Sequence, residues 1–100
     1  MNKLFIKDEY LNILINIFDE CCPNSIVLAY GSRLKNEAHE LSDLDLSIKN
    51  LDENICSLNK LKEIISNSNI PFIVYINNFD SMPDYFKDEI IRNNVVIYGK

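Results

Sequence analysis

A strictly alternating segment, residues 43–48 (DLDLSI), constrains the fold of this chain more than any other part of its sequence. Successive side chains of a β-strand point to opposite faces, so this segment predicts a strand with one apolar and one acidic face. The apolar face needs a hydrophobic layer to cover it. The acidic face places the carboxylates of Asp43 and Asp45 side by side.

Three other segments have the length and composition of strands. Residues 25–30 (SIVLAY) are rich in β-formers and too short for a helix between Pro23 and Gly31. Residues 72–76 follow Pro71, and residues 95–98 form a last short apolar run. The sequence therefore predicts about four strands.

Helical periodicity covers the remaining apolar segments. It predicts a helix from about Asp8 to Cys21 and a second one carrying an apolar face of five residues, Ile55, Leu58, Leu61, Ile64 and Ile65. For the third helix, Ser81 is the expected cap before Pro83, and Asn93-Asn94 are expected to end it in a left-handed turn.

The predicted element order is α-β-β-α-β-α-β. The first two strands are joined by about a dozen residues with room for at most one helical turn, which favours a mixed sheet over a purely parallel one. We expect one α/β (α+β) domain over residues 1–100, with a small mixed sheet of about four strands and helices packed mainly on one face.

Charge and cysteine content exclude several classes of protein. Ten Lys and Arg against 15 Asp and Glu give a net charge of −5, which argues against strong direct binding of nucleic acid. Three cysteines without a C-x-x-C pair indicate small buried side chains in a reducing compartment. Because neither a signal peptide nor a membrane-spanning apolar run is evident, a cytoplasmic protein is expected.

The acidic strand face and the turn before it suggest phosphate chemistry. Asp43 and Asp45 can hold Mg²⁺, which prefers oxygen ligands and also takes phosphate oxygens, and a pair of such ions can support phosphoryl displacement. Gly31 lets the backbone approach a phosphate, and Ser32 adds a hydroxyl and an N–H. Arg33 either adds positive charge near a triphosphate or is a solvated or surface-paired side chain.

Together these residues carry a resemblance to a known family. The segment from Ala29 to Asp45 resembles the GS-x10-D-x-D signature of the DNA polymerase β-type nucleotidyltransferases. It begins with AYGSR (Ala29 to Arg33), has ten residues from Arg33 to Ser42 after the Gly-Ser pair, and ends in Asp43-Leu44-Asp45. The short length and the segment from Ile70 onward are similar to the minimal nucleotidyltransferases (MNT) of that superfamily.

The resemblance implies an enzyme that transfers a nucleotidyl group, with AMP from ATP expected, to a protein or other hydroxyl acceptor. It implies two Mg²⁺ ions on Asp43 and Asp45, which would be the catalytic residues, and a nucleotide held by Gly31, Ser32 and Arg33. It also implies pairing with an all-helical HEPN protein, in some cases as the antitoxin of a toxin–antitoxin pair. A homodimer is the other expected assembly.

Two positions depart from the family pattern. A third carboxylate is expected at position 75, and this chain has Tyr75, a poor Mg²⁺ ligand that would leave one ion in place of two. Asp80 could replace it only if the following loop folds back. In the loop after Arg33, Asn36 replaces the usual glycine, and His39 is expected to be solvent-exposed.

Two functions therefore remain open from sequence, beside a third interpretation as a small α/β domain with no nucleotide chemistry. The first is an active nucleotidyltransferase, which the intact Asp43 and Asp45 pair favours. The second is a catalytically weakened nucleotide-binding or partner-masking module, an antitoxin or regulatory subunit, which Tyr75 favours.

Overall fold

The structure, a computed structural model, describes residues 3–34 and 42–99. Its elements in chain order are α1 (Asp8–Cys21), β1 (Ile26–Tyr30), the 3-10 helix η1 (Gly31–Leu34), β2 (Leu44–Lys49), α2 (Leu58–Ser66), β3 (Val74–Asn78), the 3-10 helix η2 (Phe79–Ser81), α3 (Asp84–Arg92) and β4 (Val95–Tyr98). The predicted order of helices and strands is confirmed, with two short 3-10 helices added.

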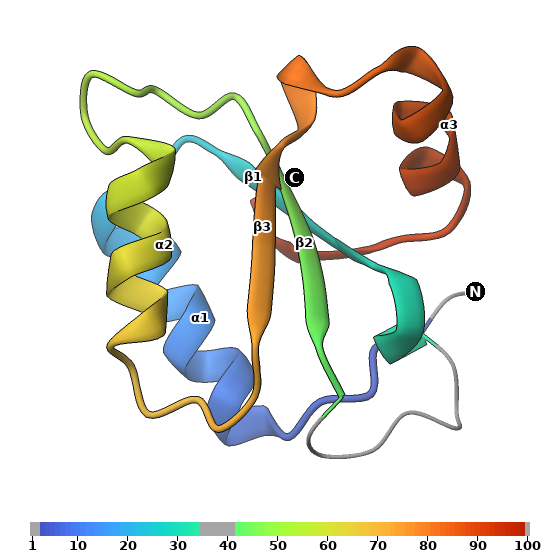
Figure 1. The fold of residues 1–100 in the computed structure, drawn as a ribbon. Helices are drawn as coiled ribbons and strands as arrows, with labels where there is room; N and C mark the ends of the chain where they lie inside the picture. The colour runs from blue at the N-terminus through green and yellow to red at the C-terminus, as the bar shows by residue number, and fades with distance from the viewer. Residues whose placement is uncertain (1–2, 35–41, 100) are drawn as a thin grey trace.

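The four strands form one mixed sheet in the order β3-β2-β1-β4. β1 runs antiparallel to both β2 and β4, whereas β2 and β3 are parallel. Two helices, α1 and α2, lie on one face of the sheet and α3 lies on the other (Figure 1). This is the α+β arrangement expected from the sequence, with helices mainly on one face.

The main core lies between the sheet and the pair α1 and α2. The apolar face predicted for β2 is fully buried there, together with side chains of both helices, and its most enclosed members are Leu14, Phe18, Val27, Ala29, Leu44, Leu46, Ile48 and Leu61. Full burial of one such leucine, isoleucine or phenylalanine contributes about 1.5–3 kcal/mol. Because this layer fixes Leu44 and Leu46, the alternate residues of β2 must point to the opposite face.

A smaller cluster covers part of that opposite face. Leu28 of β1, Phe79 of η2 and Ile90 of α3 form its buried centre, and Tyr30 and Phe86 pack against it. α3 therefore covers only part of this face, the part near β1, which leaves the residues at one end of β2 and β3 open.

The strands predicted at residues 25–30 and 43–48 are β1 and β2, each starting one residue later, and two other predicted bounds differ by more than that. Ile55 lies in the turn before α2 and is 67% exposed, so it is no part of the helix's apolar face. The third strand is Val74–Asn78, two residues later than residues 72–76. The buried Phe72 packs edge-on against Tyr10 of α1 before the strand begins.

The ends of α3 also differ from the prediction. Ser81 belongs to η2, and the N-cap residue Pro83 has no side-chain bond. At the other end, Asn93 has an extended backbone with φ −137°. The amide of Asn94 instead donates to the carbonyls of Ile90 and Ile91 at 2.9 and 3.1 Å, which satisfies two terminal carbonyls without a left-handed turn.

Two further expectations concern the chain as a whole. Cys22 and Cys56 are buried and Cys21 is half-buried, and all three are free thiols, as expected of small apolar side chains. Among the residues described, no helix has the length and apolar character needed to cross a bilayer.

Candidate functional site

The predicted site residues meet at one end of the sheet. The antiparallel register sets Tyr30, the last residue of β1, opposite Asp45, and the parallel register sets Tyr75 of β3 beside Asp45 on the other side. Gly31 and Ser32 follow β1 directly, and Asp43 immediately precedes β2. The structure therefore brings the Gly-Ser turn and the Asp-x-Asp segment together, although ten residues separate them in sequence.

Gly31 is in tight contact with the acidic pair. Its φ is +83°, and a Cβ placed on it would lie 2.5 Å from Oδ2 of Asp45. The backbone conformation strains any L side chain at this position, and an added Cβ would push the Asp45 carboxylate aside. Because Gly31 has no Cβ, the Asp45 carboxylate can lie close to the Gly31 backbone.

A Gly31→Ala substitution should therefore affect both folding and the site. Left-handed backbone in a non-glycine residue costs about 1–3 kcal/mol, so the unfolding free energy should fall by that amount, measured by urea denaturation. The new methyl group should also displace the Asp45 carboxylate and abolish Mg²⁺-dependent stabilisation by ATP.

Gly99 offers a matched control for this substitution. Its φ is +77° and an added Cβ would meet the backbone oxygen of Ser25, far from Asp45 in the fold. Gly99→Ala should lower stability but retain the nucleotide response. If Gly31→Ala kept its stabilisation by Mg²⁺ and ATP as fully as Gly99→Ala, the close approach of Gly31 to the Asp45 carboxylate would be contradicted.

Ser32 lies in η1 at the mouth of the site. Its hydroxyl donates to the carbonyl oxygen of Asp43 at 3.5 Å, a long bond that a better acceptor can replace. Beside it, Gly31 and Ser32 line a groove of about 640 Å³ that runs between η1 and α3 and also includes Tyr30, Leu34, Tyr85, Phe86, Glu89, Ile90 and Asn93. We call this the α3 groove. Its size is in the range of small-molecule sites.

The acidic pair has the electrostatics of a cation site. Asp45 is half-buried on β2 and Asp43 is exposed. Burial raises the pKa of Asp45 above its ordinary value, and the negative charge of Asp43 raises it further. A bound cation would remove both penalties.

The raised pKa of Asp45 predicts a specific pH dependence. The folded chain holds this proton more tightly than the unfolded chain, so this group's contribution to stability is lost as pH rises from about 4 through the raised pKa. The unfolding free energy of the metal-free wild type, minus that of Asp45→Asn, should decline over this window. Mg²⁺ competes with the proton, so stabilisation by Mg²⁺ should weaken as pH falls through the same window. A difference independent of pH would contradict this assignment.

Arg33 does not lie in solvent. It is 3% exposed, its Nε donates to the carbonyl of Ser42 at 2.9 Å, and one of its terminal nitrogens donates to the carbonyl of Phe5 at 3.0 Å. The guanidinium also stacks over the ring of Phe72, with 4.2 Å between the guanidinium carbon and the ring centroid. The solvated and surface-paired alternatives for Arg33 are therefore wrong. These contacts tie the N-terminal segment to the residue before Asp43.

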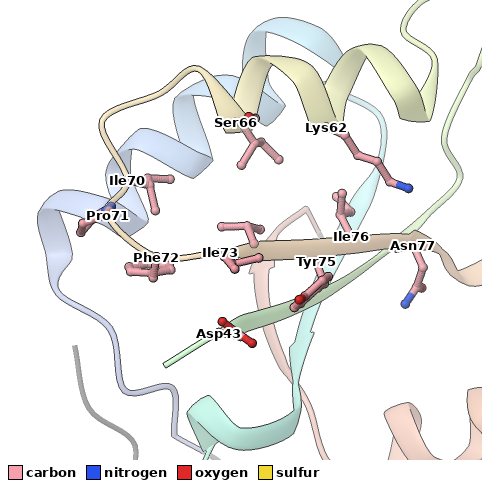
Figure 2. Close-up of a pocket in the computed structure, with 12 residues that line it drawn as sticks. Asp43, Lys62, Ser66, Ile70, Pro71, Phe72, Ile73, Tyr75, Ile76 and Asn77 are labelled. Atoms are coloured by element: carbon pink, nitrogen blue, oxygen red, sulfur yellow. The ribbon is translucent and has the colours of Figure 1, made fainter. Parts of the chain in front are cut away.

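Tyr75 occupies the position where the third carboxylate was expected. It is 53% exposed and stands in register with Asp45. Figure 2 shows Tyr75 on the side of β3 where Asp43 lies, whereas Lys62 of α2 lies on the other side. Tyr75 and Asp43 line a groove of about 850 Å³ along β3, whose other walls come from α2 and residues 70–77. We call this the β3 groove.

Asp80 does not replace the missing carboxylate. Its Oδ2 accepts a hydrogen bond from the backbone N–H of Asn50 at 3.0 Å, just beyond the far end of β2. Asn50 is five residues after Asp45 along an extended strand, which corresponds to roughly 16 Å. The alternative in which Asp80 folds back into the site is therefore excluded.

A chain of side-chain hydrogen bonds next to the site was not predicted from the sequence. The hydroxyl of the fully buried Ser47 donates to Oδ1 of Asn77 at 2.6 Å, and Nδ2 of Asn77 donates to the hydroxyl of Tyr30 at 2.8 Å. The chain links all three strands that carry the site. Ser47 continues the alternation of Asp43 and Asp45, and this two-residue period was the sequence signal that placed Ser47 on the same strand face as the acidic pair. The partner across the sheet could not be read from sequence.

The donor set fits a hard divalent cation. Among the described residues there is no group of three or more histidine, cysteine or acidic side chains that could hold a metal ion. The paired carboxylates of Asp43 and Asp45 suit Mg²⁺, which binds through one or two carboxylates and completes its shell with water and phosphate oxygens. Two residues named from sequence, Asn36 and His39, lie outside the described part of the chain.

Comparison with known proteins identifies the family. Residues 12–100 match the family described as polymerase beta, nucleotidyltransferase. The chain is 34% identical over 99 residues to the "Probable protein adenylyltransferase MntA" of Haemophilus influenzae, covering 98% of this chain and 87% of the relative. It is 36% identical over 73 residues to the "Putative protein adenylyltransferase MJ1547" of Methanocaldococcus jannaschii, covering 73% of this chain and 54% of that relative. The chain thus belongs to the polymerase β nucleotidyltransferase family, among its minimal members.

Proposed function

We propose that this chain binds Mg²⁺ and a nucleoside triphosphate, with ATP as the donor, and transfers AMP to a hydroxyl group of a protein. The observation that carries the proposal is the contact of Gly31 with Asp45, which joins a phosphate-type turn to an acidic pair. The printed names of the two relatives, "Probable protein adenylyltransferase MntA" and "Putative protein adenylyltransferase MJ1547", support the choice of donor and acceptor.

Each residue has a defined part in this reaction. Asp43 and Asp45 hold Mg²⁺, which when bound neutralises phosphate charge and polarises the reacting phosphoryl group. Gly31 and Ser32 receive the β- and γ-phosphates, with the backbone brought close by the missing Cβ and the Ser32 hydroxyl free to exchange its 3.5 Å bond. The chain of Ser47, Asn77 and Tyr30 keeps the strands in register.

Incorporation of label from α-labelled ATP tests the proposal. The chain is incubated with Mg²⁺, the labelled nucleotide and candidate acceptor proteins, and protein-bound label is measured after denaturation. Label that requires both Mg²⁺ and Asp43 supports nucleotidyl transfer. Absence of label, together with absence of any stabilisation by Mg²⁺ and ATP, would overturn it.

The proposed acceptor is a partner protein, and the family resemblance points to a helical HEPN protein in a toxin–antitoxin pair, with a homodimer as the other assembly. A second candidate function is a partner-masking module that binds nucleotide without turnover. Tyr75 favours this candidate because a phenol is a poor metal ligand. Inhibition of such a partner that survives Asp43→Asn would favour masking over transfer.

A further inference from the structure

Of the tyrosines in the described residues, Tyr75 is the one beside the acidic pair on the side away from the Gly-Ser turn. Its register partner on β2 is Asp45, and the register partner of Asp45 on β1 is Tyr30, which directly precedes Gly31. Neighbouring strands lie about 4.8 Å apart. The order across the sheet is therefore Gly-Ser turn, acidic pair, Tyr75, with all three groups at the same end.

This order matches the line that a displacement at phosphorus requires. On the proposed function, the β- and γ-phosphates lie at Gly31 and Ser32, and the α-phosphate lies over Asp43 and Asp45. Attacking and leaving oxygens must be in line through the phosphorus. The leaving pyrophosphate is on the Gly31 side, so the attacking hydroxyl must come from the β3 side, where Tyr75 stands.

We propose that Tyr75 is itself a nucleotidyl acceptor, so that the chain adenylylates its own phenol in cis. The Tyr75 oxygen forms a bond to the α-phosphorus, the bond from that phosphorus to the bridging oxygen breaks, and pyrophosphate leaves. The phenol proton passes to water. The product is a tyrosine phosphodiester of the nucleoside monophosphate, and the nucleoside triphosphate is the only co-reactant.

The surroundings of Tyr75 suit an acceptor better than a structural residue. Its side chain is 53% exposed, so water reaches the phenol and can take the proton. It lines the 850 Å³ β3 groove together with Asp43, which leaves room for an attached nucleotide (Figure 2). By contrast, Tyr30 is held by Asn77 at 2.8 Å and packs against Phe86.

The inference rests on the proposed function and deepens it by naming an acceptor. The test uses the purified full chain with Mg²⁺ and α-labelled ATP, followed by peptide mapping by mass spectrometry. We expect label on Tyr75 in the wild type and its loss in Tyr75→Phe, which keeps the ring. Tyr98→Phe is the matched control. It removes a strand phenol that bonds Asp19 of α1, at 2.8 Å, and it should keep the label.

A mixing experiment separates cis from trans transfer. The Asp43→Asn variant keeps the accepting phenol but lacks the acidic pair, whereas the Tyr75→Phe variant keeps the acidic pair but lacks the phenol. If transfer occurs only within one chain, a mixture of the two variants should remain unlabelled. Label in the mixture, label on another residue, or label retained in Tyr75→Phe would each overturn the proposal. If the wild type labels a separate acceptor protein and never itself, this inference fails while the proposed function stands. If Mg²⁺ and ATP neither label nor stabilise the chain, both fail.

Discussion

The Asp43→Asn variant is expected to lose Mg²⁺-dependent transfer of AMP, with a fall in rate of at least ~100-fold. Removing one of two carboxylates leaves the cation with a single protein ligand, and metal stabilisation of a reacting phosphoryl group contributes several kcal/mol. Each 1.36 kcal/mol corresponds to about a tenfold change in rate. The measurement is the initial rate of label incorporation from α-labelled ATP at saturating Mg²⁺.

The design of this experiment separates loss of the site from loss of the fold. Asp43 is exposed and precedes β2, so its amide variant should keep the melting temperature of the wild type measured without Mg²⁺. Asp88→Asn, an exposed carboxylate on α3 outside both grooves, serves as the matched control and should retain full activity. A wild-type rate in Asp43→Asn would contradict the assigned role of this residue.

The Arg33→Ala variant is expected to lose at least about 3.5 kcal/mol of unfolding free energy. It removes the charge-assisted hydrogen bonds to the carbonyls of Ser42 and Phe5, each worth about 1.5–3 kcal/mol. It also removes the stacking over Phe72, worth about 0.5–2 kcal/mol. For a chain of this size the melting temperature should fall by at least roughly 14 °C. Thermal and urea denaturation give the two values.

Arg92→Ala provides the comparison, because Arg92 is an exposed arginine in the last turn of α3. A surface substitution of this kind usually changes stability by less than about 0.5 kcal/mol. The unfolding free energy of Arg33→Lys should lie between those of Arg33→Ala and Arg92→Ala, since lysine keeps the charge without the planar guanidinium. If Arg33→Ala kept wild-type stability and lost only affinity for nucleotide, Arg33 would be a nucleotide ligand and its buried contacts would be incidental.

Much of the fold can be predicted from local patterns, because the spacing of apolar residues within one segment determines whether that segment forms a helix or a strand. The alternation over residues 43–48 predicts β2 and its buried face, and the periodicity from Asp8 to Cys21 predicts α1 with its observed bounds. The meeting of Gly31 with Asp45 follows as well. Two antiparallel strands joined by one connection must bring the end of the first beside the start of the second.

The remaining features depend on partners that are distant in sequence. The burial of Arg33 depends on Phe5 and Phe72, which only the folded chain brings to it. The bond from Asn77 to Tyr30 likewise spans 47 positions. No local pattern encodes such contacts, so neither the burial of Arg33 nor the bonds of Ser47 and Asn77 could be predicted from the sequence.

The role of Tyr75 bears on two questions: whether the chain transfers a nucleotidyl group, and which hydroxyl group receives it. If the phenol only replaces a metal ligand, the chain binds nucleotide and turns over poorly. If it receives the nucleotidyl group, the same side chain is the site of modification. The register of Tyr75 with Asp45 is the same in both cases, so only chemistry distinguishes them.

The central claim is that Gly31, Ser32, Asp43 and Asp45 form one site for a metal-bound triphosphate. Calorimetric titration of the wild-type chain with a non-hydrolysable ATP analogue, with and without Mg²⁺, tests it most directly. We predict binding that requires Mg²⁺ and disappears in Asp45→Asn. Binding of equal strength without Mg²⁺, or no binding in either condition, would contradict the claim.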